Sequence, residues 1–302
     1  MKVIPPITIT DGMLTNSTVA EPAAGETAWN AATSYTLGQQ VIRTTTHRIY
    51  QNLIAGIDAT TPETAPTRWL DVGPTLRWAM FDTLRNSATT SATTMTVVLT
   101  PGRRVDSIAL MGVVGESVTI SMTSSPLGTV YTDTANLILR NTVSWSGYFF
   151  GTFTYSGSVV RFDLPQFTNA VITVTVARAS GNVSLGALVL GTAVEVGKVL
   201  TQARSDALNF SSVTRDAFGN ATLVQRRTVP TTNQQIVTDP TNIDKLREVR
   251  SALNAVPAVW SGMDDKASNP HFESLLILGI YKEFSITFDP TLTNVSLSLE
   301  EI

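Results

Sequence analysis

The chain contains few residues that could carry out acid, base or metal chemistry. Its two histidines, His47 and His271, are too few for a multi-histidine metal site, and neither has a carboxylate beside it at ligand spacing. We interpret both as surface histidines and expect no metal ligand. The absence of cysteine excludes a disulfide framework, a thiolate zinc site and a cysteine nucleophile.

Paired carboxylates are the remaining catalytic candidates, because glycoside hydrolases place two of them about 5–9.5 Å apart. Asp264 and Asp265 are the most visible pair, but adjacent residues in a Gly-Met-Asp-Asp-Lys loop point apart and usually keep a turn solvated. We expect Glu300 and Glu301 in a solvated tail. No nucleophile elbow, phosphate-binding loop or dinucleotide fingerprint is present. The sequence therefore predicts no catalytic residue, no cofactor and no enzymatic activity.

Aromatic residues between Thr27 and Gly73 are the positive signal of a binding site. Exposed Trp and Tyr faces bind sugars because the CH-rich face of a pyranose packs on a π surface. Trp29, Tyr35 and Trp69 are the candidate glycan-platform residues. The alternative is that these aromatic residues form the core of a very small unit, and Tyr50, which we place in a strand, is expected there.

The order and spacing of these residues resemble the small carbohydrate-binding modules of the chitin- and cellulose-binding type. That family has a tryptophan, a tyrosine six residues later, a Tyr-x2-Gly-x2-Val turn, another tyrosine and a closing tryptophan. The matching residues here are Trp29, Tyr35, Gly38, Val41, Tyr50, Pro62 or Pro66, and Trp69. The resemblance implies a β module over residues 27–75 that binds polysaccharide.

The composition limits the possible partners of the chain. Charged residues make up 15% of the 302 residues, so much of the surface must be Thr, Ser, Asn and Gln. A net charge of −3 provides no electrostatic basis for nucleic-acid binding. The longest apolar stretch, Leu185–Val196, contains Gly, Thr and Glu and is too short to span a bilayer, so we expect no membrane insertion. Pro5 and Pro6 interrupt any signal-peptide core, so we expect no export signal.

The elements that must position any site are mostly strands. Residues 1–26 are expected to form an extended N-terminal arm, either frayed or docked on a neighbouring subunit. Residues 76–197 contain many short Val-, Ile- and Thr-rich runs between turns, with the clearest alternation in Ser117–Met122 and Val171–Val176, which predicts a jelly-roll-like β-sandwich.

Residues 198–302 are expected to form a small α+β domain with one helix. Ile243, Leu246, Val249 and Leu253 recur at helical spacing, with Asn242 as a possible N-cap and Pro257 as a stop. Strands are expected on both sides of the helix, at Leu208–Arg215, Ala221–Val229, Ala258–Trp260, Ser274–Phe288 and Val295–Leu299.

Several segments after the module resemble tail-associated proteins of tailed bacteriophages. These segments are Arg68–Asp82, Arg215–Leu223, Val256–Gly262 and Leu278–Phe284. The resemblance implies a galactose-binding-like sandwich and a tail-, fibre- or baseplate-associated virion protein, made in the host cytoplasm and assembled in several copies. Its expected partners are other virion proteins, copies of itself and bacterial surface polysaccharide.

Two other functions compete with this expectation. A glycan-degrading depolymerase that uses the module for targeting requires a buried carboxylate pair in a groove. A secreted bacterial binding protein requires an export signal and leaves the segments after Gly73 unexplained.

Overall fold

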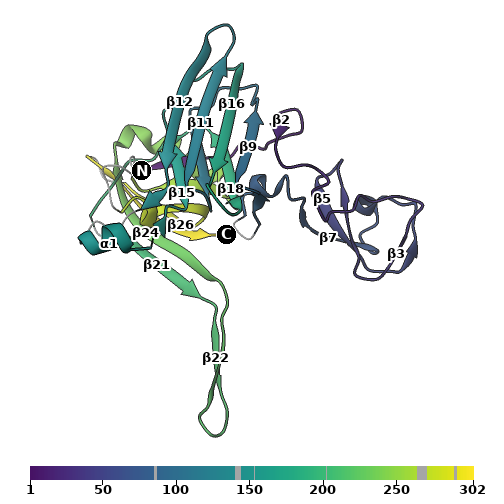
Figure 1. Ribbon diagram of the computed structural model, residues 1–302. Helices are drawn as coiled ribbons and strands as arrows, with labels where there is room; N and C mark the ends of the chain where they lie inside the picture. Colours follow the sequence, from purple (N-terminus) through teal and green to yellow (C-terminus); the bar gives the residue numbers. More distant parts are fainter. Residues whose placement is uncertain (85–86, 140–143, 153, 202, 264–270, 289–290) are drawn as a thin grey trace. The chain divides into compact units, whose positions relative to one another are not determined.

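The computed structural model describes residues 1–84, 87–139, 144–152, 154–201, 203–263, 271–288 and 291–302. With 48% of the chain in strands, the protein is mainly β, which confirms the predicted class (Figure 1). The chain divides into two compact units. The C-terminal unit comprises Met1–Ile7, Asp106–Ile108 and Val189–Ile302, and the sandwich unit comprises Thr8–Val105 and Ala109–Leu188.

The largest sheet of the sandwich unit is antiparallel. Its five strands are β2 (Leu14–Ser17), β9 (Thr94–Leu99), β11 (Ser117–Ser124), β12 (Gly128–Asn136) and β16 (Ala170–Ala177). They lie in the order β12-β11-β16-β9-β2. The arrangement of the strands is β-sandwich-like.

Further strands between residues 89 and 191 form smaller sheets. The order β15-β10-β18 joins β15 (Ser158–Arg161), β10 (Ser107–Met111) and β18 (Ala187–Gly191). Two further pairs are β8 (Thr89–Ser91) with β17 (Val183–Leu185), and β13 (Ile138–Leu139) with β14 (Thr154–Tyr155). A short 3-10 helix, η2 (Ala79–Phe81), precedes β8.

Alternating side chains explain why the central strands form. In β16 every second residue is buried, from Ala170 to Val176, and β11 shows the same alternation from Val118 to Met122. The two strands pair antiparallel with Ser117 opposite Ala177. The prediction of strands at these two positions is confirmed, and they are neighbours in the sheet.

The module expected over residues 27–75 is built from short strands. They are β3 (Ser34–Tyr35), β4 (Gln40–Arg43), β5 (Arg48–Asn52), β6 (Gly56–Ile57) and β7 (Trp69–Pro74), with a 3-10 turn η1 (Pro62–Thr64). β4, β5 and β7 form one sheet, and β3 pairs with β6. The buried residues at the centre are Tyr35, Val41, Tyr50 and Trp69.

The C-terminal unit is organised around an eight-stranded sheet with the order β19-β1-β25-β26-β27-β24-β20, and β21 also pairs with β24. Its strands are β1 (Lys2–Ile4), β19 (Val194–Glu195), β20 (Lys198–Val199), β21 (Arg204–Asn209), β24 (Thr228–Thr238), β25 (Ala258–Ser261), β26 (Leu276–Thr287) and β27 (Thr293–Glu301). Two 3-10 turns, η3 (Pro240–Asn242) and η4 (Glu273–Leu275), precede α2 and β26.

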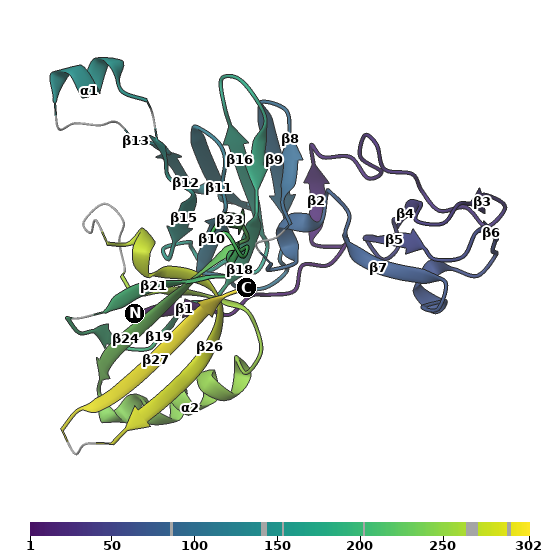
Figure 2. The same ribbon diagram turned by 90° about the horizontal axis from the view of Figure 1, so that it is seen from below.

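The helix α2 (Ile243–Ala252) lies across one face of this sheet, as Figure 2 shows. Leu246, Val249 and Leu253 are buried in one cluster with Trp260 and Ile277, which confirms the predicted helix and its apolar face. Asn242 stands at the N-cap position, but its side-chain amide donates to Thr238 Oγ1 at 3.2 Å instead of capping the helix.

The first residues of the chain are part of the two units and do not form a separate arm. β1 lies inside the eight-stranded sheet, where Val3 is opposite both Val194 and Trp260, and β2 pairs with β9. The apolar side chains of Val3 and Ile4 are fully buried, which explains why this segment joins a core. A strand of three residues is too short to give a periodic signal in the sequence.

Candidate binding surfaces

Two of the three predicted glycan-platform residues lie in the core of the module. Tyr35 and Trp69 are each 2% exposed, and their rings meet edge to face with centroids 5.3 Å apart. The Tyr35 hydroxyl accepts from the Asn30 amide at 2.6 Å and donates to the Asn30 carbonyl oxygen at 3.1 Å. Neither ring presents a face to a sugar, because a unit this small without disulfides needs its largest apolar side chains for its core.

Trp29, the third predicted residue, is half-buried at the edge of the same core. The guanidinium of Arg43 lies 4.9 Å from the centroid of its ring, which is a cation–π distance. Glu63 holds that guanidinium with oxygens 3.2 Å from Nε and 3.0 Å from Nη2. Trp29 is thus the one predicted platform residue that keeps an accessible part, and a cation covers some of its ring.

His47 is not the surface histidine that the sequence suggested. Its side chain is 17% exposed, with Nε2 2.9 Å from Asp11 and Nδ1 3.0 Å from Glu21. Its ring stacks on that of Trp78 at a centroid distance of 4.1 Å. Both ring nitrogens lie within hydrogen-bond distance of carboxylates, so neither faces a candidate nucleophile. The interpretation from sequence was wrong because both acidic partners come from distant parts of the chain.

Glu21 connects His47 to the segment that follows the module. Its carboxylate, only 6% exposed, also accepts from Thr75 Oγ1 at 2.6 Å and from Trp78 Nε1 at 3.2 Å. Glu26 supports the same segment by accepting from the Leu76 amide at 2.9 Å. A buried carboxylate with several donors is a structural anchor, and this one fixes residues 21–26 against residues 75–78.

The predicted acidic pairs have different outcomes. Asp264 and Asp265 lie outside the described residues. Glu300 and Glu301 belong to β27, and Glu301 pairs with Arg227 at 3.1 Å while Glu300 pairs with Lys282, so the expected solvated tail is wrong. Within the described ranges, no cluster of three or more His, Asp or Glu side chains is arranged to hold a metal ion.

An exposed aromatic region that the sequence analysis did not single out lies in the sandwich unit. We call residues 144–152, 154 and 155 the aromatic segment; it contains the short helix α1 (Trp145–Phe150), which Figure 2 shows beyond the end of β13. Trp145 and Phe150 are 80% and 87% exposed, and Phe149 and Tyr148 are also exposed. The Trp145 and Phe149 rings lie within 14° of parallel with centroids 6.0 Å apart. The absence of any charged residue from 141 to 160 is the sequence signal that would have located this region.

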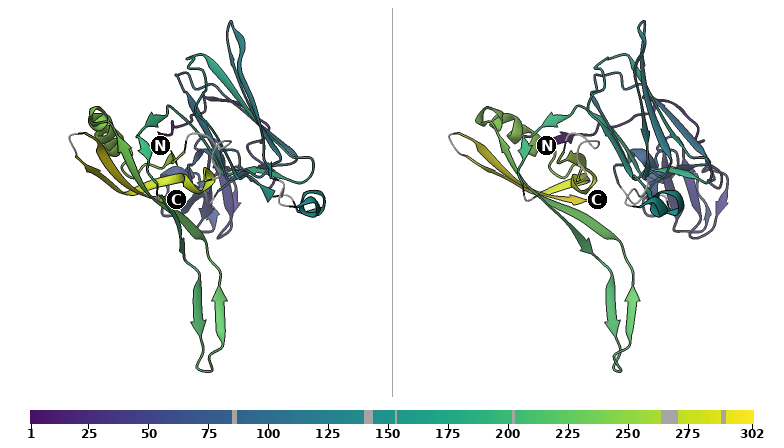
Figure 3. Two further views of the ribbon diagram at one scale, coloured as in Figure 1. Left: turned by 90° about the vertical axis from the view of Figure 1, so that its left-hand side faces the viewer. Right: turned by 60° about the vertical axis from the view of Figure 1, so that its left-hand side comes forward.

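A second exposed region belongs to the C-terminal unit. We call residues 204–228 the hairpin arm; it comprises β21, β22 (Ser212–Arg215), β23 (Ala221–Val224) and the start of β24. Figure 3 shows it extending well beyond the sheet that carries it. No residue of the arm is buried, and Phe218 at its turn is 91% exposed. The sequence predicted strands at Leu208–Arg215 and Ala221–Val229, which overlap these elements, but not that both faces would be left exposed.

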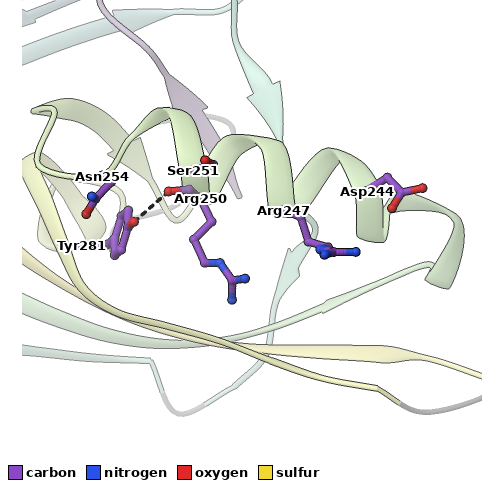
Figure 4. A pocket seen from close by; sticks show the side chains of 6 residues that line it. All are labelled: Asp244, Arg247, Arg250, Ser251, Asn254 and Tyr281. Atoms are coloured by element: carbon purple, nitrogen blue, oxygen red, sulfur yellow. Dashed lines mark hydrogen bonds between the residues drawn. The ribbon is translucent and has the colours of Figure 1, made fainter.

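A hollow of about 590 Å³ lies along α2 and is lined by Asp244, Arg247, Arg250, Ser251, Asn254 and Tyr281 (Figure 4). The Tyr281 hydroxyl donates to the Arg250 carbonyl oxygen at 2.7 Å, which ties β26 to the helix. Asp244 is the sole carboxylate among the lining residues. The hollow therefore lacks the carboxylate pair that glycoside hydrolysis requires.

Comparison of the chain with protein-family models, curated proteins and solved structures finds no match. Within the part of the chain that the structure describes, no helix has the length and apolar character needed to cross a membrane.

Proposed function

We propose that this protein is a non-enzymatic structural component of a tailed-bacteriophage virion, associated with the tail, fibre or baseplate and assembled in multiple copies. The resemblance of residues 68–82 and of the C-terminal segments to tail-associated proteins supports a role in a tailed-bacteriophage particle. We further propose that the sandwich is of the galactose-binding-like kind.

The hairpin arm is the observation that carries the assembly role. Its exposed apolar side chains are Leu208, Phe210, Val213, Phe218, Leu223 and Val224. A two-stranded ribbon is marginal in water by itself, and apolar groups on such a ribbon gain stability when a partner covers them. Such an element suits a chain that assembles with other chains.

We also propose that the protein contacts host surface glycan, and that the contact uses the aromatic segment. Supporting this choice, Trp145 and Phe149 offer exposed ring faces, whereas Tyr35 and Trp69 are buried. Aromatic platforms of this kind bind single sugars weakly. Repetition in a multi-copy assembly raises the apparent affinity by roughly 10²–10⁴ without any new contact.

Mass spectrometry of purified particles, followed by localisation in cryo-microscopy maps, tests the structural role. We expect the chain at a stoichiometry of several copies in the tail region. Its absence from purified particles would refute the proposal.

Binding to polysaccharide purified from the host surface tests the glycan contact separately. The double variant Trp145→Ala/Phe149→Ala should lose binding, and Leu127→Ala, which truncates an exposed leucine on the turn between β11 and β12, should retain it. If the wild-type particle binds no host polysaccharide, the glycan contact fails and the structural role still stands.

A further inference from the structure

The hairpin arm has the properties of an element that binds another polypeptide. In residues 204–228 every residue is exposed except Ser211 and Ser212, which are partly buried, so neither face of the ribbon packs on a core. The two-stranded sheet at its end contains β22 and β23 alone, with Ser212 opposite Val224 and Arg215 opposite Ala221. Its order comes from backbone pairing and from its turn rather than from buried area.

The turn at the tip is well defined, so the arm presents a fixed shape. The Asp216 carboxylate accepts from the backbone amides of Phe218 at 2.9 Å and of Asn220 at 2.8 Å. Gly219 has a φ of +84°, a conformation that disfavours other residues. The turn holds Phe218 at the outermost point of the ribbon, with its ring in solvent. An ordered, apolar tip lowers the entropic cost of binding.

The backbone of the arm also offers hydrogen bonds. β22 pairs with β23 and with no other strand of the described chain, so the outer edges of this ribbon carry unpaired backbone groups. Unpaired strand edges add strands from other chains. The arm therefore offers apolar side chains and a free β edge together.

Charge indicates which partner the arm fits. The arm contains four arginines, Arg204, Arg215, Arg226 and Arg227, and two aspartates, Asp206 and Asp216, which leaves it at +2. The whole chain carries −3, so the part outside the arm carries −5. Two arms repel each other, whereas an arm and the remainder of a second copy attract.

We propose that the hairpin arm of one copy binds the body of a second copy of this chain, where the body is everything outside residues 204–228. This inference rests on the multi-copy assembly proposed above and names the element that makes the contact. Binding of the arm of one copy to the body of the next is a head-to-tail interface. Such an interface generates a ring or an open filament rather than a two-fold dimer.

Charge reversal on the arm tests the electrostatic part of the proposal. Arg204→Glu/Arg226→Glu changes the arm from +2 to −2 and should weaken self-association of the full chain at least tenfold, as measured by sedimentation velocity over a concentration series. Arg103→Glu, an exposed arginine of the body, should leave self-association unchanged or strengthen it. Equal weakening by both variants, or none by either, would overturn the proposal.

Truncation of the tip tests the apolar part. Phe218→Ser should weaken self-association about tenfold or more, since aromatic anchors dominate interfaces. Leu127→Ser removes another exposed apolar side chain and should have no effect. Both residues lie outside the cores, so matched thermal unfolding will show that each variant is folded.

A cross-link from the tip identifies the partner surface directly. Because the chain has no cysteine, Ala217→Cys provides a unique attachment point for a benzophenone maleimide. Cross-links to residues outside 204–228 of another copy support the proposal. Cross-links confined to a second arm, or a wild-type chain that stays monomeric at roughly millimolar concentration, overturn it. Self-association that survives all arm variants refutes this inference alone, whereas absence from particles refutes the virion role alone.

Discussion

Two aromatic-rich regions of the sandwich unit use the same residue types in opposite ways. In the module, Tyr35 and Trp69 are each 2% exposed and pack against each other at 5.3 Å. In the aromatic segment, Trp145 and Phe150 are 80% and 87% exposed. The difference shows that aromatic content identifies neither a core nor a binding surface; what surrounds the rings decides it.

The surroundings of the two regions differ in a way that physical chemistry explains. The module places Tyr35, Tyr50 and Trp69 on short paired strands, where alternate side chains point to one side and meet. The aromatic segment places its rings on a helix of six residues, which has no second layer in the described chain to cover it. Burial follows from opposing layers, because each ring needs contacts on both faces.

The largest expected effect is that of Trp69→Ala. Removing this ring from the core of the module should cost about 3–5 kcal/mol, which is comparable to the whole stability of so small a unit. Limited proteolysis should then cut within residues 27–75, and the module's unfolding transition should disappear.

Leu70→Ala is the matched control for this change. Leu70 follows Trp69 in β7 but is half exposed, so its truncation should leave the module folded and resistant to protease. If Trp69→Ala is as stable as Leu70→Ala, the module does not depend on its aromatic core and the comparison fails.

Tyr35→Phe should have a smaller effect, because the ring stays and only the hydroxyl is lost. The two hydrogen bonds to the backbone of Asn30 would be absent, and the amide that donates at 2.6 Å would lose its acceptor. We expect a loss of about 1–2 kcal/mol in the free energy of unfolding of the module. Tyr155→Phe, at an exposed tyrosine of the aromatic segment, should cost less than about 0.5 kcal/mol. Equal costs would mean that the Tyr35 hydroxyl contributes nothing.

Glu63→Gln tests the ion pair beside Trp29, whose burial is intermediate between that of Trp69 and that of Trp145. Partial burial is the largest single influence on the pKa of Glu63 and raises it. The hydrogen bond and the charge of Arg43, together with hydrogen bonds from its own backbone amide and from Thr61, outweigh burial and hold the pKa below the ordinary value of 4.5. A carboxyl whose pKa is lowered by folding stabilises the folded state above its ordinary pKa and loses that contribution as the pH falls through the folded pKa.

The variant should therefore lose a few tenths of a kcal/mol at pH 7, as is usual for an accessible ion pair, and should match the wild type at about pH 2–3. Denaturant unfolding of the module at both pH values measures the difference. Glu248→Gln, an exposed glutamate of α2, serves as the control for the loss of charge. A deficit that persists unchanged at low pH would show that the Arg43–Glu63 pair is not its source.

Much of the fold could be predicted because its signals are local. The alternation in β11 and β16 and the helical spacing of Leu246, Val249 and Leu253 depend on neighbouring residues alone. The position of β1 inside the C-terminal sheet could not be predicted, because its partners Val194 and Trp260 lie some 190 to 260 residues away. The His47 cluster was missed for the same reason, since Asp11 and Glu21 reach it from a different segment.

The candidate site was harder to predict than the fold. The aromatic spacing predicts short strands over residues 27–75, and the structure places β3 to β7 there. Spacing alone does not state which ring faces point outward and which are needed for the core. The hairpin arm shows the converse. Its sequence predicts an ordinary pair of strands, and only the three-dimensional structure shows that both faces of β22 and β23 are exposed.

The smallest expected effect on stability is that of Trp145→Ala, even though this change removes the same side chain as Trp69→Ala. The Trp145 ring is 80% exposed and its aromatic contact is with Phe149 at 6.0 Å, a pair on one short helix that contributes a few tenths of a kcal/mol. Denaturant unfolding should place the variant within about 0.5 kcal/mol of the wild type. A loss above roughly 2 kcal/mol would mean that this ring is packed in a core, like that of Trp69. The aromatic segment would then have no free ring faces, and the proposed glycan contact would have no surface to use.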